Sequence, residues 1–305
     1  MSDFPAVLQF DGGNVRSWLD DQSANIEEAL DDVGAVLLRG LPVSSAQAFD
    51  EVVAAFDLPV FSYEASLSNA VRINHTPRVF TANEAPPEVE IHLHHEMAQT
   101  PIAPSRLFFC CLSPADEGGA TPLCQSEALL EAFAEQHPKW ADELKRKGLR
   151  YVTRMPSDND ESAGQGRSWK STLGVNSQSE AEARLSELGY DFEWQSDGAV
   201  RTVSPVLPAV VDVKEGRASF FHQLLAAYLG WPGVRENPAT ALSFGDDAEI
   251  PSELLETLAS LSSDYTYDLN WQAGDVAVVN NYLVMHGRRP YSGATKREVL
   301  VSMAP

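Results

Sequence analysis

Short runs of β-forming residues near both ends of the chain enclose a middle that is rich in helix signals. Residues 34–40 form a brief apolar run between two glycines, and residues 105–112 form a longer apolar and aromatic run. Residues 275–279 and 298–302 repeat this pattern near the end, around turn-forming Pro and Gly. We therefore predict one β core with a large insertion rather than two successive domains.

Helix signals in the middle of the chain have recognisable starts and stops. Two helices should meet at His137-Pro138, because Pro suits the first turn of a helix but cannot continue one. Ser177 and Glu180 are spaced as a capping box, which opens a helix that ends at Gly189.

Three further segments are helix candidates: residues 23–33, 217–229 and 251–262. The fold class predicted is mixed β with α, and residues 1–305 are expected to form a single domain.

Acidic residues outnumber basic residues two to one: 44 Asp and Glu against 22 Lys and Arg give a formal net charge of −22. So acidic a surface repels phosphate backbones and anionic lipid, which excludes a general nucleic-acid or membrane binder. No apolar stretch approaches the roughly 20 residues that span a bilayer. The start lacks a signal-peptide pattern, and three cysteines are too few for a disulfide framework. We expect a soluble cytoplasmic protein.

Three of the seven histidines cluster in residues 91–96, Ile-His-Leu-His-His-Glu. In a strand, residues two apart point to one face, so His94 and Glu96 would present an imidazole and a carboxylate to one metal ion. A second His from a distant strand would complete a two-His, one-carboxylate site, which leaves three positions open on Fe(II). With seven His and 44 acidic residues, about one His-x-acid pair is expected by chance, so the motif alone decides nothing.

A second feature lies near the end of the chain. Residues 275–286 form an apolar run that ends in His286, and Arg297 follows in the predicted last strand. A cation on a strand antiparallel to a metal-ligand strand can hold the far carboxylate of a metal-chelating diacid. The planar guanidinium suits that bidentate contact better than Lys does. His286 and Arg297 therefore strengthen the interpretation of His94 and Glu96 as metal ligands.

The pattern of His94, Glu96, Thr121, His286 and Arg297 resembles the Fe(II)/2-oxoglutarate oxygenases of the taurine dioxygenase and clavaminate synthase-like superfamily. Thr121 lies 27 residues after His94, and Arg297 lies 11 residues after His286, as in the taurine dioxygenase pattern. The likeness runs from about residue 30 to the C-terminus and is greatest to plant clavaminate synthase-like proteins and to bacterial hydroxylases of the syringomycin-biosynthesis type. The stretches that carry it include Phe-Thr-Ala-Asn-Glu (80–84), His-His-Glu-Met-Ala-Gln (94–99), Gly-Gly-Ala-Thr-Pro (118–122) and His-Gly-Arg-Arg-Pro (286–290).

The resemblance implies that His94, Glu96 and His286 ligate Fe(II), and that Thr121 and Arg297 hold the distal carboxylate of 2-oxoglutarate. With O2 as oxidant, the co-substrate yields succinate and CO2. Halogenating relatives have a small residue in place of this Glu, so the carboxylate favours hydroxylation, desaturation or cyclisation. The implied fold is a double-stranded β-helix, or jelly roll, with flanking helices. A large helical insertion at about 125–265 would form the substrate pocket and lid.

The implied substrate is a small molecule, an amino acid or an amino-acid-derived metabolite, either free or tethered to a carrier protein. Four residues are candidates for substrate contact. Trp169 and Lys170 follow a stretch with lid-like composition, Arg288 follows the last metal ligand, and His222 stands where relatives have Asn. Each also has a structural interpretation, as a packed aromatic, a solvated cation, a turn residue or a core histidine.

Two other functions stay open. A Zn(II)-dependent hydrolase or a cupin-like isomerase would use the same three ligands, but Arg297 and Thr121 would then have no role. A cupin-type site would combine His92 and His94 with a Glu about four residues on, where the chain has Ala98. The last possibility is a catalytically silent relative that keeps the fold for binding, which the intact ligand set opposes.

Overall fold

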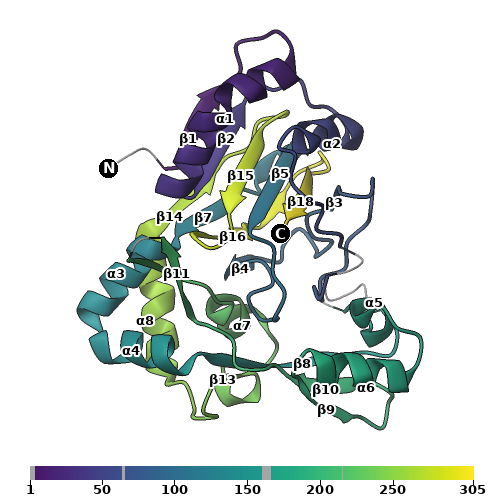
Figure 1. Cartoon of the computed structure of the whole chain (residues 1–305), viewed down its shortest axis with the longest axis vertical. Helices are drawn as coiled ribbons and strands as arrows, with labels where there is room; N and C mark the ends of the chain where they lie inside the picture. The colour runs from purple at the N-terminus through teal and green to yellow at the C-terminus, as the bar shows by residue number, and fades with distance from the viewer. Residues whose placement is uncertain (1–3, 64–65, 160–165, 215) are drawn as a thin grey trace.

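Two facing β-sheets form the centre of the molecule (Figure 1). The computed structural model describes residues 4–63, 66–159, 166–214 and 216–305. The larger sheet runs in the order β1 (Ala6–Gln9), β2 (Ala35–Arg39), β15 (Val276–Asn280), β5 (Arg106–Ser113), β18 (Glu298–Ala304) and β3 (Phe80–Thr81). The smaller runs β14 (Thr266–Leu269), β7 (Thr121–Gln125), β16 (Val284–Arg288) and β4 (Ile91–His94).

Strands from the two ends of the chain lie side by side in the larger sheet, as predicted. β15 pairs antiparallel with both β2 and β5, and β18 pairs with β5 and β3. The β core is thus assembled from segments on either side of the middle region.

β5 shows why its sequence is a continuous apolar run. Leu107 and Phe109 pack between the two sheets. Phe108 and Cys110 pack on the opposite face, under helices α1 (Val15–Asp32) and α2 (Ala46–Ala54). A strand that is buried on both faces has no polar alternation.

Helix α1 begins earlier than the predicted residue 23. The side chain of Asn14 caps it by accepting from the N–H of Ser17, and Trp18 and Leu19 already pack against the larger sheet. The apolar contacts of the first turns therefore lie outside the predicted range.

Helix boundaries in the middle region largely follow their sequence signals. α3 (Ser126–Gln136) and α4 (Pro138–Lys147) are divided at His137. The capping box of Ser177 and Glu180 is present at the start of α6 (Gln178–Glu187). α8 (Ser252–Ser262) matches the predicted 251–262.

The middle region is nevertheless mixed α/β rather than mainly helical. A sheet in the order β13 (Leu242–Phe244), β8 (Leu149–Met155), β10 (Val200–Val203) and β9 (Asp191–Trp194) lies there. α5 (Trp169–Leu173) and α6 share a core cluster with its strands. The region also contains a hairpin of β11 (Val210–Lys214) and β12 (Arg217–Phe220).

The prediction of one helix over 217–229 is wrong in its first part. Residues 217–220 pair with β11, and Phe220 is fully buried against Phe133 of α3. The helix α7 (Leu224–Gly230) starts only after this strand. Both segments are apolar, and periodicity alone does not separate a short buried strand from a helix.

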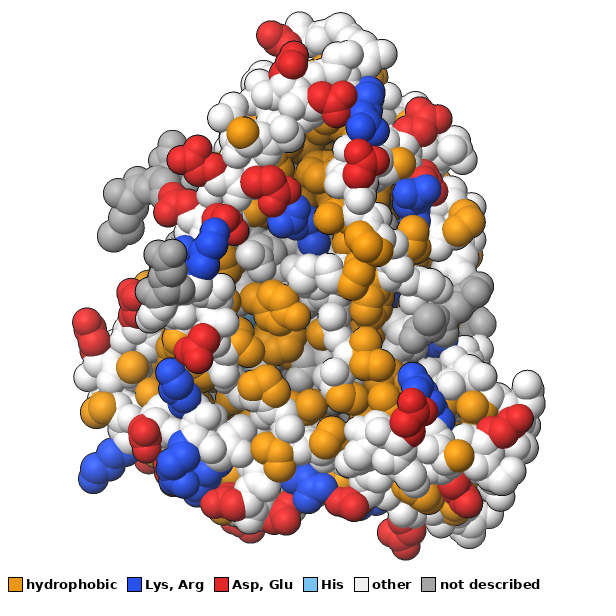
Figure 2. Space-filling view, in the orientation of Figure 1, with side chains coloured by type: hydrophobic (Ala, Val, Ile, Leu, Met, Phe, Trp, Pro, Cys, Tyr) orange, Lys and Arg blue, Asp and Glu red, His pale blue; other side chains and the backbone are white. Residues whose placement is uncertain are grey.

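The surface and the cysteines agree with the composition. Figure 2 shows acidic and basic side chains around the periphery of one face, with hydrophobic side chains gathered along its middle. In the described part of the chain, no helix has the length and apolar character needed to cross a bilayer. The three cysteines are free and buried, and burial raises the pKa of Cys111 and Cys124 to about 12.

Candidate metal centre

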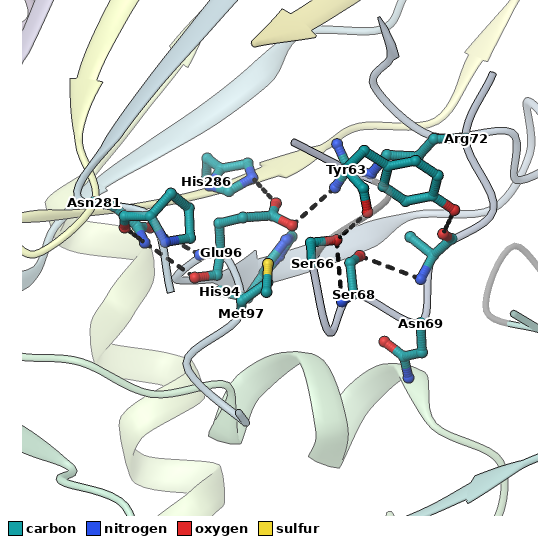
Figure 3. Close-up of polar contacts among 12 residues, drawn as sticks. Tyr63, Ser66, Ser68, Asn69, Arg72, His94, Glu96, Met97, Asn281 and His286 are labelled. Atoms are coloured by element: carbon teal, nitrogen blue, oxygen red, sulfur yellow. Dashed lines mark hydrogen bonds and ion pairs between the residues drawn. The ribbon is translucent and has the colours of Figure 1, made fainter. Parts of the chain in front are cut away.

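His94 and His286 lie opposite each other on two paired strands. His94 ends β4, His286 lies in the middle of β16, and the antiparallel pairing sets the two in register. Their ring centroids are 4.4 Å apart (Figure 3). Gly287 permits this close pairing, because a Cβ at that position would lie 2.3 Å from the carbonyl oxygen of Ile91.

Glu96 lies just beyond β4, in a turn rather than in the strand. The side-chain oxygen of Asn281 accepts from the N–H of Glu96 at 2.8 Å, and its amide donates to the carbonyl oxygens of Glu96 at 3.0 Å and Pro104 at 2.7 Å. The following Met97 has a φ of 59°, which turns the chain away from the strand direction. Glu96 Oε2 thereby lies 3.5 Å from His286 Nε2.

The three side chains form a group suited to a metal ion. Single ligand atoms of His94, Glu96 and His286 all lie within 4.8 Å of one another; the ring of His92 is not in this group. His94 Nδ1 is 2.8 Å from the carbonyl oxygen of His92. A carbonyl can only accept, so Nδ1 carries the proton and Nε2 keeps its lone pair.

The electrostatic surroundings keep the histidine in its ligand form. Burial, and then the neighbouring His286, lowers the pKa of His94 to about 4, so the imidazole is neutral near pH 7. The neutral imidazole of His94, the imidazole of His286 and the carboxylate of Glu96 fit a divalent transition metal with facial ligation and open coordination positions.

Arg72 is a buried cation beside Glu96 that no sequence pattern marked. Its Nη2 lies 2.9 Å from Glu96 Oε1, and both side chains are 6% exposed. Burial opposes ionisation of Glu96, but the charge of Arg72 and the hydrogen bond from His286 outweigh it and lower the pKa of this carboxyl below its usual range. Arg72 lies in an irregular segment before β3, where there is no periodicity to interpret.

The triad borders a cavity that also contains Thr121 and Arg297, so the structure brings these predicted residues together. The hydroxyl oxygen of Thr121 accepts from Trp271 Nε1 at 2.9 Å, which leaves its own hydrogen available to donate. Arg297 donates from Nε to the carbonyl oxygen of Gly119 at 2.9 Å. No carboxylate of the described residues forms an ion pair with Arg297.

The cavity lining is positive although the chain as a whole is strongly negative. Arg72, Arg288 and Arg297 face one carboxylate, Glu96; three positive charges and one negative charge leave +2 when the histidines are neutral. Burial and the neighbouring charge of Arg288 lower the pKa of Arg297 to about 10. A buried cation without a carboxylate partner favours an anionic ligand.

Arg288 lines the cavity, but its hydrogen bonds go elsewhere. The guanidinium donates to the carbonyl oxygens of Ala85, Pro86 and Val89 at 2.6–2.9 Å. It therefore fastens the 85–89 loop to β16.

The other three substrate candidates lie outside this cavity. Trp169 packs edge-to-face on Trp194 at 5.2 Å and donates from Nε1 to the carbonyl oxygen of Gly198. Lys170 is exposed beside Trp169. His222 is fully buried.

His222 and His95 support the turn that carries Glu96. His95 Nδ1 lies 3.0 Å from the backbone nitrogen and 3.1 Å from the carbonyl oxygen of His222, and His95 Nε2 lies 2.8 Å from Ser126 Oγ. Gln223 Nε2 donates to the carbonyl oxygen of His95 at 3.1 Å. Burial lowers the pKa of both rings, that of His222 to about 3. These bonds fix the residue just before Glu96.

Comparison with known sequences gives a consistent result. Residues 2–303 match the model of the family described as "Taurine catabolism dioxygenase TauD, TfdA family". The clavaminate synthase-like protein of Arabidopsis thaliana is 38% identical over 92% of this chain and 84% of its own length. The dapdiamide synthesis protein DdaC of Enterobacter agglomerans is 26% identical over 91% of this chain and 84% of its own length.

Solved structures share the fold at low sequence identity. A taurine dioxygenase from Burkholderia xenovorans matches with a TM-score of 0.57 and 15% identity, over 98% of this chain and 86% of that one. AAD-2, solved with Mn(II) and N-oxalylglycine, matches with a TM-score of 0.56 and 14% identity, over 99% and 94% of the two chains. The two central sheets thus correspond to the double-stranded β-helix of these proteins.

Proposed function

The chain belongs to the TauD/TfdA family of 2-oxoglutarate-dependent dioxygenases, and on this basis we propose that it oxidises an amino acid or an amino-acid-derived metabolite. The oxidation is a hydroxylation, desaturation or cyclisation, with conversion of 2-oxoglutarate to succinate and CO2. The His94, Glu96 and His286 group fits the iron on which the family depends.

One observation carries the proposal: a metal-ligand triad shares a cavity with a buried, carboxylate-free arginine. A metal alone would explain the triad, as in a hydrolase. It would not explain why Arg297 and the Thr121 hydroxyl converge on the same space. A ligand that chelates the metal at one end and carries a carboxylate at the other accounts for both features.

The chain's residues have separable roles in this chemistry. His94 and His286 hold the metal, and the bond from His94 Nδ1 to the His92 carbonyl fixes the ring tautomer. Arg297 and Thr121 bind the distal carboxylate of 2-oxoglutarate. Bound iron with 2-oxoglutarate would supply the activation of O2, and the low exposure of Glu96 and His286 would limit the access of water to that reaction.

Glu96 directs the outcome toward oxygenation. Its carboxylate would take a coordination position that halogenating relatives leave to chloride. The presence of Glu96 in the ligand group therefore supports hydroxylation, desaturation or cyclisation as the reaction.

The proposed substrate class rests on the relatives. One is named a clavaminate synthase-like protein and the other a dapdiamide synthesis protein. These names support a small metabolite as the substrate, free or tethered to a carrier protein. In the single domain that we propose, the middle region of about 125–265 contributes the outer pocket and lid.

An anaerobic titration tests the proposal without knowledge of the substrate. Apo-protein is loaded with Fe(II), 2-oxoglutarate is added, and the visible charge-transfer absorption of the chelate is recorded. We expect a band in the wild type, none in Glu96→Ala, and a weak one in Arg297→Ala. Bound metal without any band would favour the Zn(II) hydrolase or cupin-like alternative, as would turnover without O2 and 2-oxoglutarate.

A further inference from the structure

We propose that Arg72 is a positioning residue of the metal centre, which holds one oxygen of Glu96 so that the carboxylate binds the metal through the other oxygen alone. The inference rests on the proposed function only in requiring a metal ion at the triad. It assigns a task to a buried cation that does not belong to the ligand set.

The two oxygens of Glu96 face different partners. Oε1 accepts from Arg72 Nη2 at 2.9 Å, whereas Oε2 lies 3.5 Å from His286 Nε2. Figure 3 shows the carboxylate between the two, with Arg72 on one side and His286 on the other. The oxygen that faces the second histidine is the one available to a metal in the triad.

The surroundings of Arg72 hold this arrangement in place. The side chains of Arg72 and Glu96 are each 6% exposed, and the Arg72 guanidinium lies 5.5 Å from the centre of the Phe80 ring. A charge-assisted bond in so dry a site is strong. Breaking it would leave a buried charge without compensation. The pair would therefore persist with a metal ion bound to Oε2.

This restraint decides how many metal positions stay open. Two imidazoles and one carboxylate oxygen leave three positions on a six-coordinate metal. A carboxylate released from Arg72 would be free to chelate through both oxygens and fill one of them. Since 2-oxoglutarate needs two positions and O2 a third, single-oxygen binding by Glu96 is a condition for the complete complex.

Arg72 also sets the charge that the co-substrate meets. Its cation balances Glu96, so the metal ion keeps its full effective charge toward the 2-oxoglutarate dianion. Without Arg72, no arginine or lysine of the described residues would form an ion pair with Glu96, and the metal ion would offset the charge of this carboxylate instead. The metal would then bind at least as tightly as before, while the dianion would bind more weakly.

The inference therefore predicts opposite effects on two affinities, which a loss of local structure would not produce. In Arg72→Met, a side chain of similar length without donors, the Mn(II) dissociation constant should stay equal or fall. The dissociation constant of 2-oxoglutarate for the metal-loaded protein should rise about 10-fold, because the buried cation that offsets the charge of Glu96 is gone. Arg72→Lys keeps a charge and a donor, and should recover most of the co-substrate affinity.

Both constants are measured with the full-length chain, by calorimetry with Mn(II) and by anaerobic titration of the Fe(II) chelate band. Arg78→Met is the matched control. Arg78 lies on the same segment and pairs with Asp50 at 2.7 Å, but it does not line the cavity. The Arg78→Met variant should bind Mn(II) and 2-oxoglutarate as the wild type does.

Dissociation constants in Arg72→Met equal to those of the wild type would overturn the proposal. Weaker binding of both the metal ion and 2-oxoglutarate would also overturn it, because Arg72 would then be a purely structural residue. If Arg72→Met does not fold, a crystal structure of the Mn(II)-loaded wild type decides. Oε2 alone on the metal with Arg72 on Oε1 supports the inference, whereas both oxygens on the metal or a displaced Arg72 overturns it. A wild type that binds Mn(II) but never 2-oxoglutarate would instead refute the proposed function.

Discussion

Asn281 binds both backbone polar groups of Glu96 with a single, fully buried side-chain amide. Asn281 comes from the turn between β15 and β16, so the segment that leads to one metal ligand, His286, also holds the peptide of another. The geometry of the triad thus depends on a residue that would not itself contact the metal.

Replacing Asn281 with Ala should loosen the metal site and destabilise the fold. The change leaves the N–H and carbonyl of Glu96 buried without this partner, at a cost of about 1–3 kcal/mol per unsatisfied group. The metal affinity should fall about 10- to 100-fold, as measured by Mn(II) calorimetry with urea unfolding alongside. Asn280→Ala is the control, because Asn280 bonds to Leu30 and Tyr282 rather than to the ligand turn. Wild-type metal affinity in Asn281→Ala would contradict this role.

Two histidines on β4 should respond differently to the same substitution. His94→Ala removes a ligand and should abolish stoichiometric metal binding. His92→Ala, two residues away on the same strand, should retain it, because only the carbonyl of His92 supports His94. Metal content after reconstitution and gel filtration measures both. Equal loss in the two variants would refute the assignment of ligands.

Trp271 should affect the co-substrate but not the metal. Its N–H bonds to the Thr121 hydroxyl and orients it. Trp271→Phe loses one hydrogen bond of about 0.5–1.5 kcal/mol, so the dissociation constant of 2-oxoglutarate should rise about 2- to 10-fold with Mn(II) affinity unchanged. Trp194→Phe is the matched control, since its N–H bonds to Glu182 in the separate α6 and β9 region. An unchanged dissociation constant of 2-oxoglutarate in Trp271→Phe would show that the bond from Trp271 does not orient Thr121 for the co-substrate.

His222 should make the metal-free protein sensitive to acid. Burial lowers its pKa from 6.5 to about 3, so between these values the unfolded chain binds a proton that the folded chain does not. Stability contributed by His222 is therefore complete above pH 6.5 and is lost as the pH falls toward 3, at up to about 1.4 kcal/mol per pH unit.

Between pH 7 and pH 5, the free energy of unfolding of His222→Asn should accordingly fall by about 2 kcal/mol less than that of the wild type. Urea unfolding of the metal-free proteins at each pH gives the difference. His75→Asn, at an exposed position, should keep the wild-type dependence. An unaltered dependence in His222→Asn would show that the pKa of His222 is the same in the folded and the unfolded chain.

The β core and several helix boundaries could be predicted because their signals are local. The Ser177 capping box and the break at Pro138 act within one turn, and the double-faced burial of β5 is visible in its unbroken apolar run. The segment 217–220 could not be assigned in this way. Its strand state depends on pairing with β11 and on packing against α3.

The candidate site likewise contains residues that could be predicted from the sequence and residues that could not. The histidine and carboxylate ligands follow from residue type, spacing and a family resemblance, and the structure brings them together. Arg72 and Asn281 carry no such signal. Each acts through a single side chain delivered by an irregular segment or a turn, so its partner is decided only when the chain is folded.

The register of β4 against β16 ties iron loading to correct folding. His94 faces His286 only in one alignment of the two strands, and a slip of one residue would send the imidazoles to opposite faces of the sheet. A molecule with misaligned strands would lack the facing imidazoles and would bind the ion more weakly. The metal occupancy of a preparation would therefore serve as an assay of strand alignment, and iron supplied during refolding should select the correctly aligned population.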